Sequence, residues 1–556
     1  MARLLPVFLL FVFAGCSFVI DEPTLRNECN GDSDCETGTC DLMMRACITE
    51  TVAPMAVSIE VTPPEPDTGR TVIAQPFDLF SISGTLQQDL QVKGAISVIG
   101  LVTHPNFETA VPANVYFRAP HPVDGADDLV YQGESDDALT EAADRNDASY
   151  VVRVVRNTTY DVWVEPTGEA ASQLPPFNFG GVTVPETGEF TRVDIAFPTE
   201  FETLEARLVD DNESGVAGLE VRAFERETGR QVSSAVVSDA EGNFDLHLLP
   251  GADFFLQIES TEENSFVPTL AQDPANLFVS GANRPEILIP SLLPVLYRGR
   301  VDSESRSNAR IEGARVTFRS TSVLEEDTNI AGSFQATTFT DANGDFEIDV
   351  LPGMYDIVVT PPVDEPRLGV RLTEGIMIRK PRDSNVLQGQ SFEVPDRVAV
   401  GGTVRGDRRQ MTNVEVRADA LPELALVDMP ASQFNRDGDA LTDASGLFTI
   451  PLDVGRYDLS VRPDPESGFP WVVRSGFAVQ QNSRVIQMDF TASAPVIMRG
   501  RVTDAGNQTL PGAMVRAWVM AEGAEGTMRR VLAGEVEADE EGSYTLLLPP
   551  QLPPQQ

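Results

Sequence analysis

Histidine is scarce in this chain of 556 residues, which contains only three. No two of them form the His-x-x-x-His or His-Glu-x-x-His pairs that hold a catalytic zinc ion. The sequence also has no Gly-x-Ser-x-Gly nucleophile elbow and no phosphate-binding P-loop. These absences predict a protein that is not an enzyme, with no catalytic residues, no cofactor and no metal ion.

Basic residues are also few. The chain has 41 Lys and Arg residues against 85 Asp and Glu residues, a formal net charge of −44. Binding to nucleic acid needs clustered cations, so this charge excludes nucleic acid as a partner and disfavours contact with anionic lipid surfaces. Apolar residues make up 42% of the chain, so most of it is expected to fold. Because one apolar core rarely serves more than about 250–300 residues, several domains are expected.

No apolar run is long enough to form a permanent membrane span. The run from Leu4 to Phe13 follows Arg3, and small residues then precede Cys16. Residues 1–15 resemble a bacterial lipoprotein signal peptide, in which such a cysteine is lipidated and becomes the new N-terminus. The resemblance implies lipidation of Cys16 and membrane contact through that lipid. Ser17 follows in place of Asp, which implies an outer-membrane lipoprotein that faces the periplasm or the cell surface.

Cysteine is absent from the chain after residue 47. Apart from Cys16, the four others lie within residues 29–47, at Cys29, Cys35, Cys40 and Cys47. In an exported protein this cluster predicts a small module with two disulfides, for which three connectivities remain open. A four-cysteine zinc site is the alternative, and the lack of any Cys-x-x-Cys pair disfavours it.

A turn and two strands recur along the rest of the chain. In the copy between Thr340 and Pro361, Asp341 and Gly344 fit a type I turn, and alternating apolar residues follow on both sides of a Leu-Pro-Gly break. The glycine stands fourth in this turn, whereas a calcium-binding EF-hand loop needs it sixth. The Asp-x-x-Gly-x-aromatic motif begins at Asp239, Asp341, Asp443 and Asp539, at intervals of 102, 102 and 96 residues.

A repeat of this length is the size of an independent β-sandwich. Short strands separated by Gly, Pro and Asn, without a convincing amphipathic helix, favour the same class. The predicted fold is all-β, a tandem array of about five seven-stranded Greek-key-type β-sandwiches that forms a beaded rod. The expected segments are a signal peptide at 1–15, a tether at 16–28, the Cys-rich module at 29–47, a Pro-rich linker at 48–79, and sandwiches at 80–198, 199–293, 294–395, 396–493 and 494–556.

The repeat resembles the carboxypeptidase regulatory-like domain, a transthyretin-like or prealbumin-like sandwich related to Cna-B-type and starch-binding-like modules. The resemblance rests on the Gly-x-Val opening at Gly299, the Gly-Ala-x-Val strand at Gly313, the Thr-Asp-x-x-Gly-x-Phe hairpin and the Leu-Pro-Gly-x-Tyr-Asp-Ile-x-Val-x-Pro strand. In this family the domain is usually an appendage without catalytic residues, so the resemblance implies a fold and no particular activity.

The last repeat is incomplete. After Leu548 the chain reads PPQLPPQQ, and the Tyr-Asp-Ile-x-Val strand of the other copies is missing. We expect a truncated or frayed domain; the alternative is an open edge to which a partner supplies a strand.

Two tryptophans are candidate ligand-binding residues. The alternation of their strands places Trp163 beside Asp161 and Glu165, and Trp518 beside Arg516, on outward faces. Outward tryptophans beside polar groups suit sugar stacking or a protein contact, or they cover a neighbouring domain. The expected function is that of a non-enzymatic, lipid-anchored envelope protein with a structural, adhesive or protein-binding role. The alternative is binding of carbohydrate, such as a polysaccharide, through one or more starch-binding-like sandwich modules.

Overall fold

The computed structural model describes most of the chain after residue 84 and parts of what precedes it. The described residues are 39–41, 46–48, 56–64, 73–78 and 85–550, apart from internal gaps at 122–126, 137–147, 263, 274–284, 307–308, 326–327, 407–408, 425–429, 481–484 and 524–527. They fall into two compact units, Met1–Ala53 and Pro54–Gln556.

The first unit contains one described pair of strands, β1 (Thr39–Asp41) and β2 (Ala46–Ile48). They pair antiparallel, and the backbone register places Cys40 opposite Cys47. Cys16, Cys29 and Cys35 lie outside the described residues, as do the side chains of the other two cysteines. Lipidation and the two disulfides therefore stay predictions.

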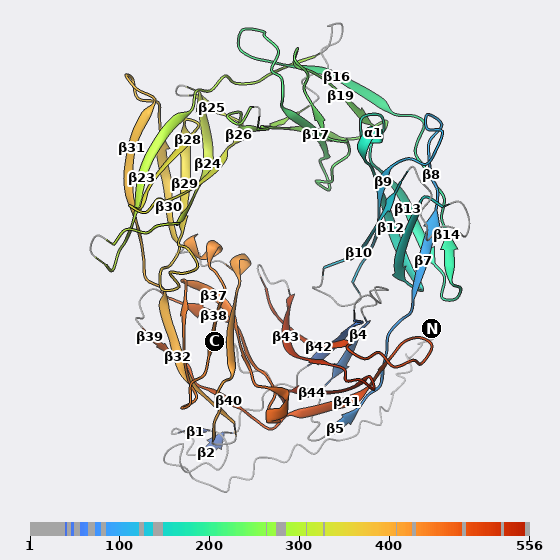
Figure 1. Cartoon of the computed structure of the whole chain (residues 1–556), viewed down its shortest axis with the longest axis vertical. Helices are drawn as coiled ribbons and strands as arrows, with labels where there is room; N and C mark the ends of the chain where they lie inside the picture. Colours follow the sequence, from blue (N-terminus) through green and yellow to red (C-terminus); the bar gives the residue numbers. More distant parts are fainter. Residues whose placement is uncertain are drawn as a thin grey trace, which may run out of the picture. The chain divides into compact units, whose positions relative to one another are not determined.

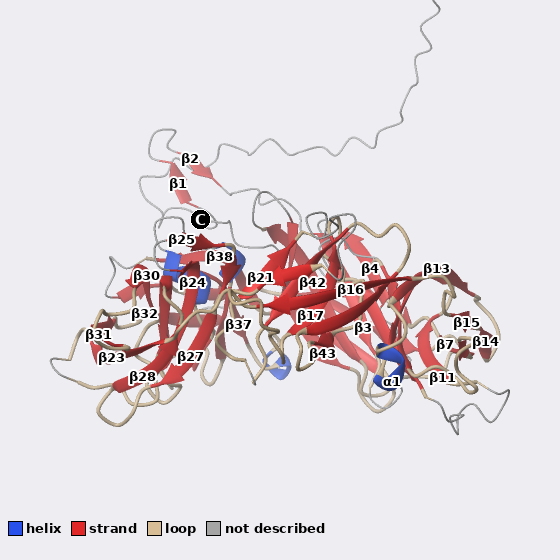
Figure 2. Cartoon of the chain, turned by 90° about the horizontal axis from the view of Figure 1, so that it is seen from above, coloured by secondary structure: helices blue, strands red, loops and turns tan. Residues whose placement is uncertain are grey.

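The second unit confirms the predicted tandem β-sandwiches. Its described residues form five large apolar clusters, and Ile99 and Ala148 form a small sixth one. Almost every element of this unit is a strand (Figures 1 and 2). The described α-helix is the four-residue α1 (Gly168–Ala171), and three short 3-10 helices lie at Pro422–Leu424, Pro430–Phe434 and Pro465–Ser467.

The first two sandwiches follow each other along the chain. The first has the sheets β10-β9-β12-β13 and β11-β7-β14, with the short pair β15-β8. The second has the sheets β19-β16-β22 and β18-β17-β20-β21. The first sandwich's strands are β7 (Ala95–Gly100), β8 (Val102–Thr103), β9 (Ala113–Ala119), β10 (Leu129–Ser135), β11 (Tyr150–Val155), β12 (Thr158–Pro166), β13 (Phe177–Val184), β14 (Phe190–Arg192) and β15 (Ile195–Ala196). Those of the second are β16 (Glu202–Val209), β17 (Glu220–Glu225), β18 (Val236–Val237), β19 (Asn243–Leu248), β20 (Phe254–Glu259), β21 (Thr269–Gln272) and β22 (Glu286–Leu288).

The third and fourth sandwiches repeat this plan. One sheet of the third has the order β28-β23-β31, and the other has β25-β24-β29-β30, with β27 also on β24. The third contains β23 (Val295–Ser303), β24 (Arg315–Glu325), β25 (Thr328–Ile330), β26 (Gly332–Ser333), β27 (Gln335–Phe339), β28 (Asp345–Val350), β29 (Gly353–Thr360), β30 (Arg371–Ile378) and β31 (Val386–Val394). The fourth contains β32 (Val398–Gly406), β33 (Arg409–Gln410), β34 (Glu415–Ala420), β35 (Gly438–Leu441), β36 (Leu447–Leu452), β37 (Gly455–Arg462), β38 (Val472–Val479), β39 (Val485–Gln487) and β40 (Phe490–Ala492).

The recurring Asp-x-x-Gly motif forms a tight turn, and its aspartate carboxylate accepts backbone hydrogen bonds within that turn. In the third sandwich, Asp341 Oδ1 accepts hydrogen bonds from the backbone N–H groups of Asn343 (2.8 Å) and Asp345 (2.9 Å). Gly344 has a φ of 71°, a left-handed conformation that glycine adopts without strain. The turn predicted from the sequence is therefore confirmed.

The last sandwich differs from the prediction, because both ends of the chain build it. Its C-terminal strands are β41 (Val496–Thr503), β42 (Met514–Glu522), β43 (Met528–Glu537) and β44 (Ser543–Leu548). Four strands from the N-terminal side complete it: β3 (Ala56–Thr62), β4 (Ile73–Asp78), β5 (Thr85–Gln87) and β6 (Leu90–Gln91). The sheets are β4-β3-β42-β43 and β44-β41-β5, with β6 also on β41. In Figure 1 the blue strands β4 and β5 lie among the red C-terminal strands.

Residues 56–62 and 73–78 are therefore strands and not part of a linker, and residues 85–91 pair with the last sandwich and not with the first. The prolines of this stretch wrongly indicated a linker. Pro63 and Pro64 directly follow β3, as Pro361 and Pro362 follow β29, so they mark the end of a strand. The donated strands lead directly along the chain into the first sandwich.

Neighbouring sandwiches are also joined elsewhere. Strand β26 of the third sandwich extends a sheet of the second by pairing with β21. Between the third and fourth, Asp453 is 4% exposed and binds Arg397 (2.7 Å) and Arg436 (3.0 Å). Its Oδ1 also accepts a hydrogen bond from the backbone N–H of Val370 in the third sandwich (3.1 Å). Burial alone would raise the pKa of Asp453, but hydrogen bonds from the two arginines outweigh it and hold that pKa below its usual value.

Candidate functional site

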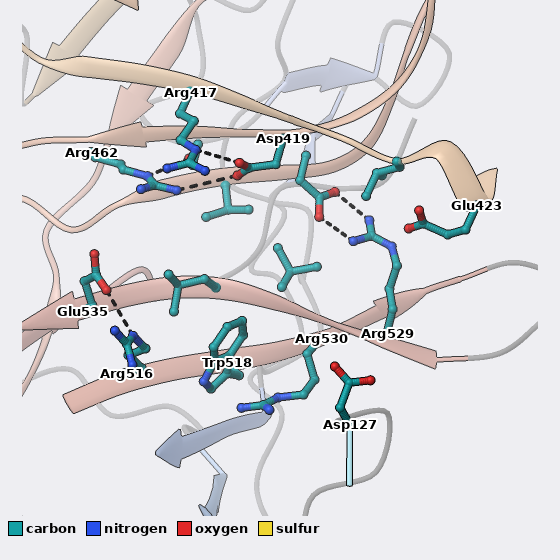
Figure 3. A pocket seen from close by; sticks show the side chains of 16 residues that line it. Asp127, Arg417, Asp419, Glu423, Arg462, Arg516, Trp518, Arg529, Arg530 and Glu535 are labelled. Carbon is teal, nitrogen blue, oxygen red and sulfur yellow. Dashed lines mark hydrogen bonds and ion pairs between the residues drawn. The ribbon is translucent and has the colours of Figure 1, made fainter. Parts of the chain in front are cut away.

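The candidate site is a cleft of about 660 Å³ between the fourth and last sandwiches (Figure 3). Strands β34 and β37 form one wall, and β42 and β43 form the other. Five arginines line it, although arginine and lysine are the minority charge of this chain. The charged and aromatic lining residues are Asp127, Arg417, Asp419, Glu423, Asp458, Arg462, Arg516, Trp518, Arg529, Arg530 and Glu535.

One carboxylate organises the wall formed by the fourth sandwich. Asp419 accepts from Nε of Arg417 at 2.6 Å and lies 3.6 Å from Nη2 of Arg462. The hydrogen bond that Arg417 donates to Asp419 raises the pKa of Arg417, while burial lowers the pKa of Arg462. The three residues alternate along β34 and β37, which places their side chains on the sheet face opposite the core.

A bidentate ion pair joins the two walls of the cleft. Arg529 on β43 donates from Nη2 to Oδ1 of Asp458 at 2.6 Å, and from Nη1 to the second carboxylate oxygen. Asp458 lies on β37 in the fourth sandwich, and both side chains are at most 15% exposed. Because a bidentate guanidinium–carboxylate pair fixes both distance and orientation, it holds the two sandwiches in one arrangement.

The opposite wall carries Trp518, one of the two predicted ligand-binding residues. Arg530 lies over its ring, 4.2 Å from the centroid, and forms an ion pair with Glu60 of the donated strand β3. Arg516 binds Glu535 at 3.2 Å and Thr62, also on β3, at 3.3 Å. Within the described part of the chain, the indole N–H of Trp518 is buried and has no acceptor. The N-terminal segment thus helps to position this wall.

Trp163 lies at a different junction. Its indole N–H donates to Glu165 at 2.9 Å, and Arg230 of the second sandwich lies 4.7 Å from its ring centroid. Arg230 also approaches Asp161 at 3.8 Å. The sequence correctly placed both tryptophans on outward faces. The structure adds that they do not share a site and that Trp163 contacts a neighbouring sandwich.

Sequence reasoning missed the arginine cluster and the donated strand. The arginines come from four strands in two sandwiches, and no local pattern brings them together. The donated strand did have a signal: Val-Thr-Pro-Pro occurs at 61–64 and again at 359–362, after an alternating apolar run in both places.

Among the described residues, no group of three or more His, Cys, Asp and Glu side chains is arranged to hold a metal ion. None of the described helices is long and apolar enough to cross a membrane.

Comparison with known proteins identifies no family. No protein-family model matches the sequence, and no curated protein matches it. Among solved structures, the chain is similar to a streptococcal ancillary pilin, at 11% identity over 55% of this chain and 99% of that one, with a TM-score of 0.22. It is similar to the TIE protein of Bacillus anthracis, at 10% identity over 69% of each chain and a TM-score of 0.16. BcpA, the major pilin subunit of Bacillus cereus, matches at 9% identity over 53% of this chain and 99% of that one, with a TM-score of 0.14. TM-scores this low identify no function.

Proposed function

We propose that this chain is a non-enzymatic protein of the bacterial cell envelope with a structural or adhesive role. One observation carries the proposal: the charged side chains at the junctions of the sandwiches bind each other. Asp453 and its partner Arg436 both hydrogen-bond to backbone groups of the third sandwich, and Asp458 pairs with Arg529 of the last, so these side chains hold adjacent sandwiches in fixed relation. Such modules suit a protein that positions surfaces for a partner in the envelope.

The proposal includes an anchor and a family relationship. The anchor is a lipid on Cys16, which tethers the chain to the outer membrane, on its periplasmic or cell-surface side. The sandwiches are related to carboxypeptidase regulatory-like domains. Support comes from the sequence: the signal-like residues 1–15 and the repeated strand and turn motifs.

The anchor is tested on the mature protein from native membranes. Mass spectrometry of its N-terminal peptide is expected to show a lipid-modified Cys16, and a Cys16→Ser variant is expected to leave the membrane fraction. An unmodified Cys16 would contradict the anchor. Pull-down from native envelope, with the Cys16→Ser variant as the soluble bait, then tests for a protein partner.

Glycan binding at the cleft is the second candidate, because Trp518 lines a cavity rich in guanidinium and carboxylate groups. Trp518→Ala is expected to abolish binding on a glycan array. Trp163→Ala is the matched control, since that residue lies at another junction and its loss is expected to leave glycan binding intact. Absence of binding by the unmodified chain, or equal loss in both variants, would reject the cleft as a sugar site.

A further inference from the structure

The donated segment is attached to the first sandwich by a very short connection. The backbone N–H of Val92 donates to Thr503 O of the last sandwich at 2.7 Å. Two residues later, Gly94 O accepts from the backbone N–H of Arg156 in the first sandwich at 3.1 Å. Only the exposed Lys93 lies between these two hydrogen bonds. The chain therefore changes from one sandwich to the other within a single residue.

The segment is bound to the last sandwich in a specific register. Its strands pair with each other and with β41 and β42. Tyr544 donates its O–H to Gln88 O at 2.7 Å, and Asp89 Oδ1 accepts from the backbone N–H of Arg501 at 2.9 Å. Five of its apolar side chains are at most 3% exposed in the core of the last sandwich: Val57, Ile59, Val61, Leu90 and Val92.

An empty last sandwich would expose both an unpaired edge and an open core, so the position is filled whenever a matching segment is present. All of the contacts above form equally well with the same segment of another molecule. The connection through Lys93 decides between the two, because a connection of one residue restricts the positions in which the chain's own segment can reach the last sandwich. The outcome then depends on the effective concentration of the chain's own segment relative to that of other molecules.

We propose that the last sandwich also takes residues 56–92 from a second copy of this chain, so that the protein forms strand-exchanged oligomers. Donor and acceptor are different surfaces, so the contact is head-to-tail and extends to further copies or closes into a ring of copies. This inference depends neither on the lipid anchor nor on a ligand in the cleft.

A mixed cross-linking experiment tests the exchange. Thr62 and Met514 are directly opposite each other on β3 and β42, and both are half-buried. One full-length preparation carries Thr62→Cys and another carries Met514→Cys, both with Cys16→Ser. They are mixed, unfolded without a reducing agent, and refolded together. A reducible dimer is expected, and its fraction is expected to rise with protein concentration during refolding.

The control mixture replaces Met514→Cys by Val363→Cys, a residue that is 94% exposed in the third sandwich. It is expected to give only a background level of dimer. A chain carrying both Thr62→Cys and Met514→Cys is expected to form an internal cross-link at low concentration. The proposal is wrong if the double variant cross-links internally while the mixture gives no more dimer than the control.

Light scattering of the unmodified chain gives a second measurement that needs no engineered cysteine. Refolding at high concentration is expected to give oligomers that persist after dilution. Deleting Lys93 is expected to increase the oligomer fraction, and inserting a short Gly-Ser segment after Lys93 is expected to decrease it. Monomers alone at every concentration, with no effect of either connection variant, would overturn the proposal.

Discussion

The third and the last sandwich have the same strand pairings but different chain connections. Residues 295–394 form the third from one continuous stretch, whereas residues 56–92 and 496–548 form the last. The pairing β24-β29-β30 corresponds to β42-β3-β4, and β28-β23-β31 corresponds to β44-β41-β5. Even the register agrees, since Val359 lies opposite Val316 in the third sandwich and Val61 lies opposite Val515 in the last. The alternating pattern of each strand therefore specifies its place in the sandwich, and the order in which the chain connects the strands is secondary.

Removing residues 56–92 is expected to have the largest effect, because it should destabilise the last sandwich and leave the third unchanged. Full burial of an aliphatic side chain contributes roughly 1.5–3 kcal/mol, so the five buried residues contribute on the order of 8–15 kcal/mol. This is as much as the whole stability of a typical domain, about 5–15 kcal/mol. We expect residues 496–548 to lose hydrogen-exchange protection while residues 295–394 keep theirs.

The matched control is a permuted chain in which residues 54–92 follow Leu548. Because the third sandwich has its corresponding strands in that order, the permuted chain is expected to regain protection of residues 496–548. Unchanged protection in the deletion variant would show that the C-terminal strands fold without the donated segment.

Breaking the junction between the third and fourth sandwiches is expected to have the next largest effect. Asp453→Ala leaves Arg397, which is 7% exposed, without its carboxylate, and such a loss typically costs about 3–5 kcal/mol. Denaturant unfolding should show this loss, and hydrogen exchange should localise it to the third and fourth sandwiches. Loss confined to the last sandwich would contradict this assignment of the junction.

Acid should weaken the same junction. The pKa of Asp453 is lowered in the folded protein, so its contribution is fully present above the unfolded value of about 3.9. The contribution is lost as the pH falls through the lower, folded pKa. The difference in stability between the unmodified chain and Asp453→Asn is therefore expected to shrink below about pH 4.

Ile59 and Ile357 occupy equivalent positions of β3 and β29, so replacing each by Ala tests the last and the third sandwich separately. The two side chains are 1% and 0% exposed, and each substitution is expected to cost about 2–5 kcal/mol. Ile357→Ala should lower protection in the third sandwich alone. Ile59→Ala should lower it in residues 496–548, although the substitution lies more than 400 positions away along the chain. Loss of protection confined to the N-terminal strands would contradict this.

The smallest expected effect comes from the Asp-x-x-Gly turns, and it should be equal in the third and the last sandwich. Asp341 and Asp539 each accept two backbone hydrogen bonds within their turns, and both turns are built from continuous chain. Replacing either by Ala should cost about 1 kcal/mol, measured by denaturant unfolding of the chain. A much larger effect of Asp539→Ala would show that this turn also supports the donated strands.

The sequence predicted what depends on neighbouring residues. The turn at Asp341, the alternation of Phe346, Ile348 and Val350, and the repeated domain all follow from local pattern. The completion of the last sandwich does not, because Thr62 and Arg516 are 454 residues apart in the chain yet form a hydrogen bond. Of the residues that line the cleft, the sequence singled out Trp518, on an outward strand face. It could not single out the arginines, because the packing of two sandwiches brings them together.

The position of β3 has a mechanical consequence. Any tension applied through the residues before Pro54 reaches β3 before every other described strand of the second unit. Five residue pairs join β3 to β42, and three buried side chains hold it in the core. A pull from that end therefore loads the last sandwich first, through its donated strand, while the sandwiches of continuous chain are loaded only afterwards.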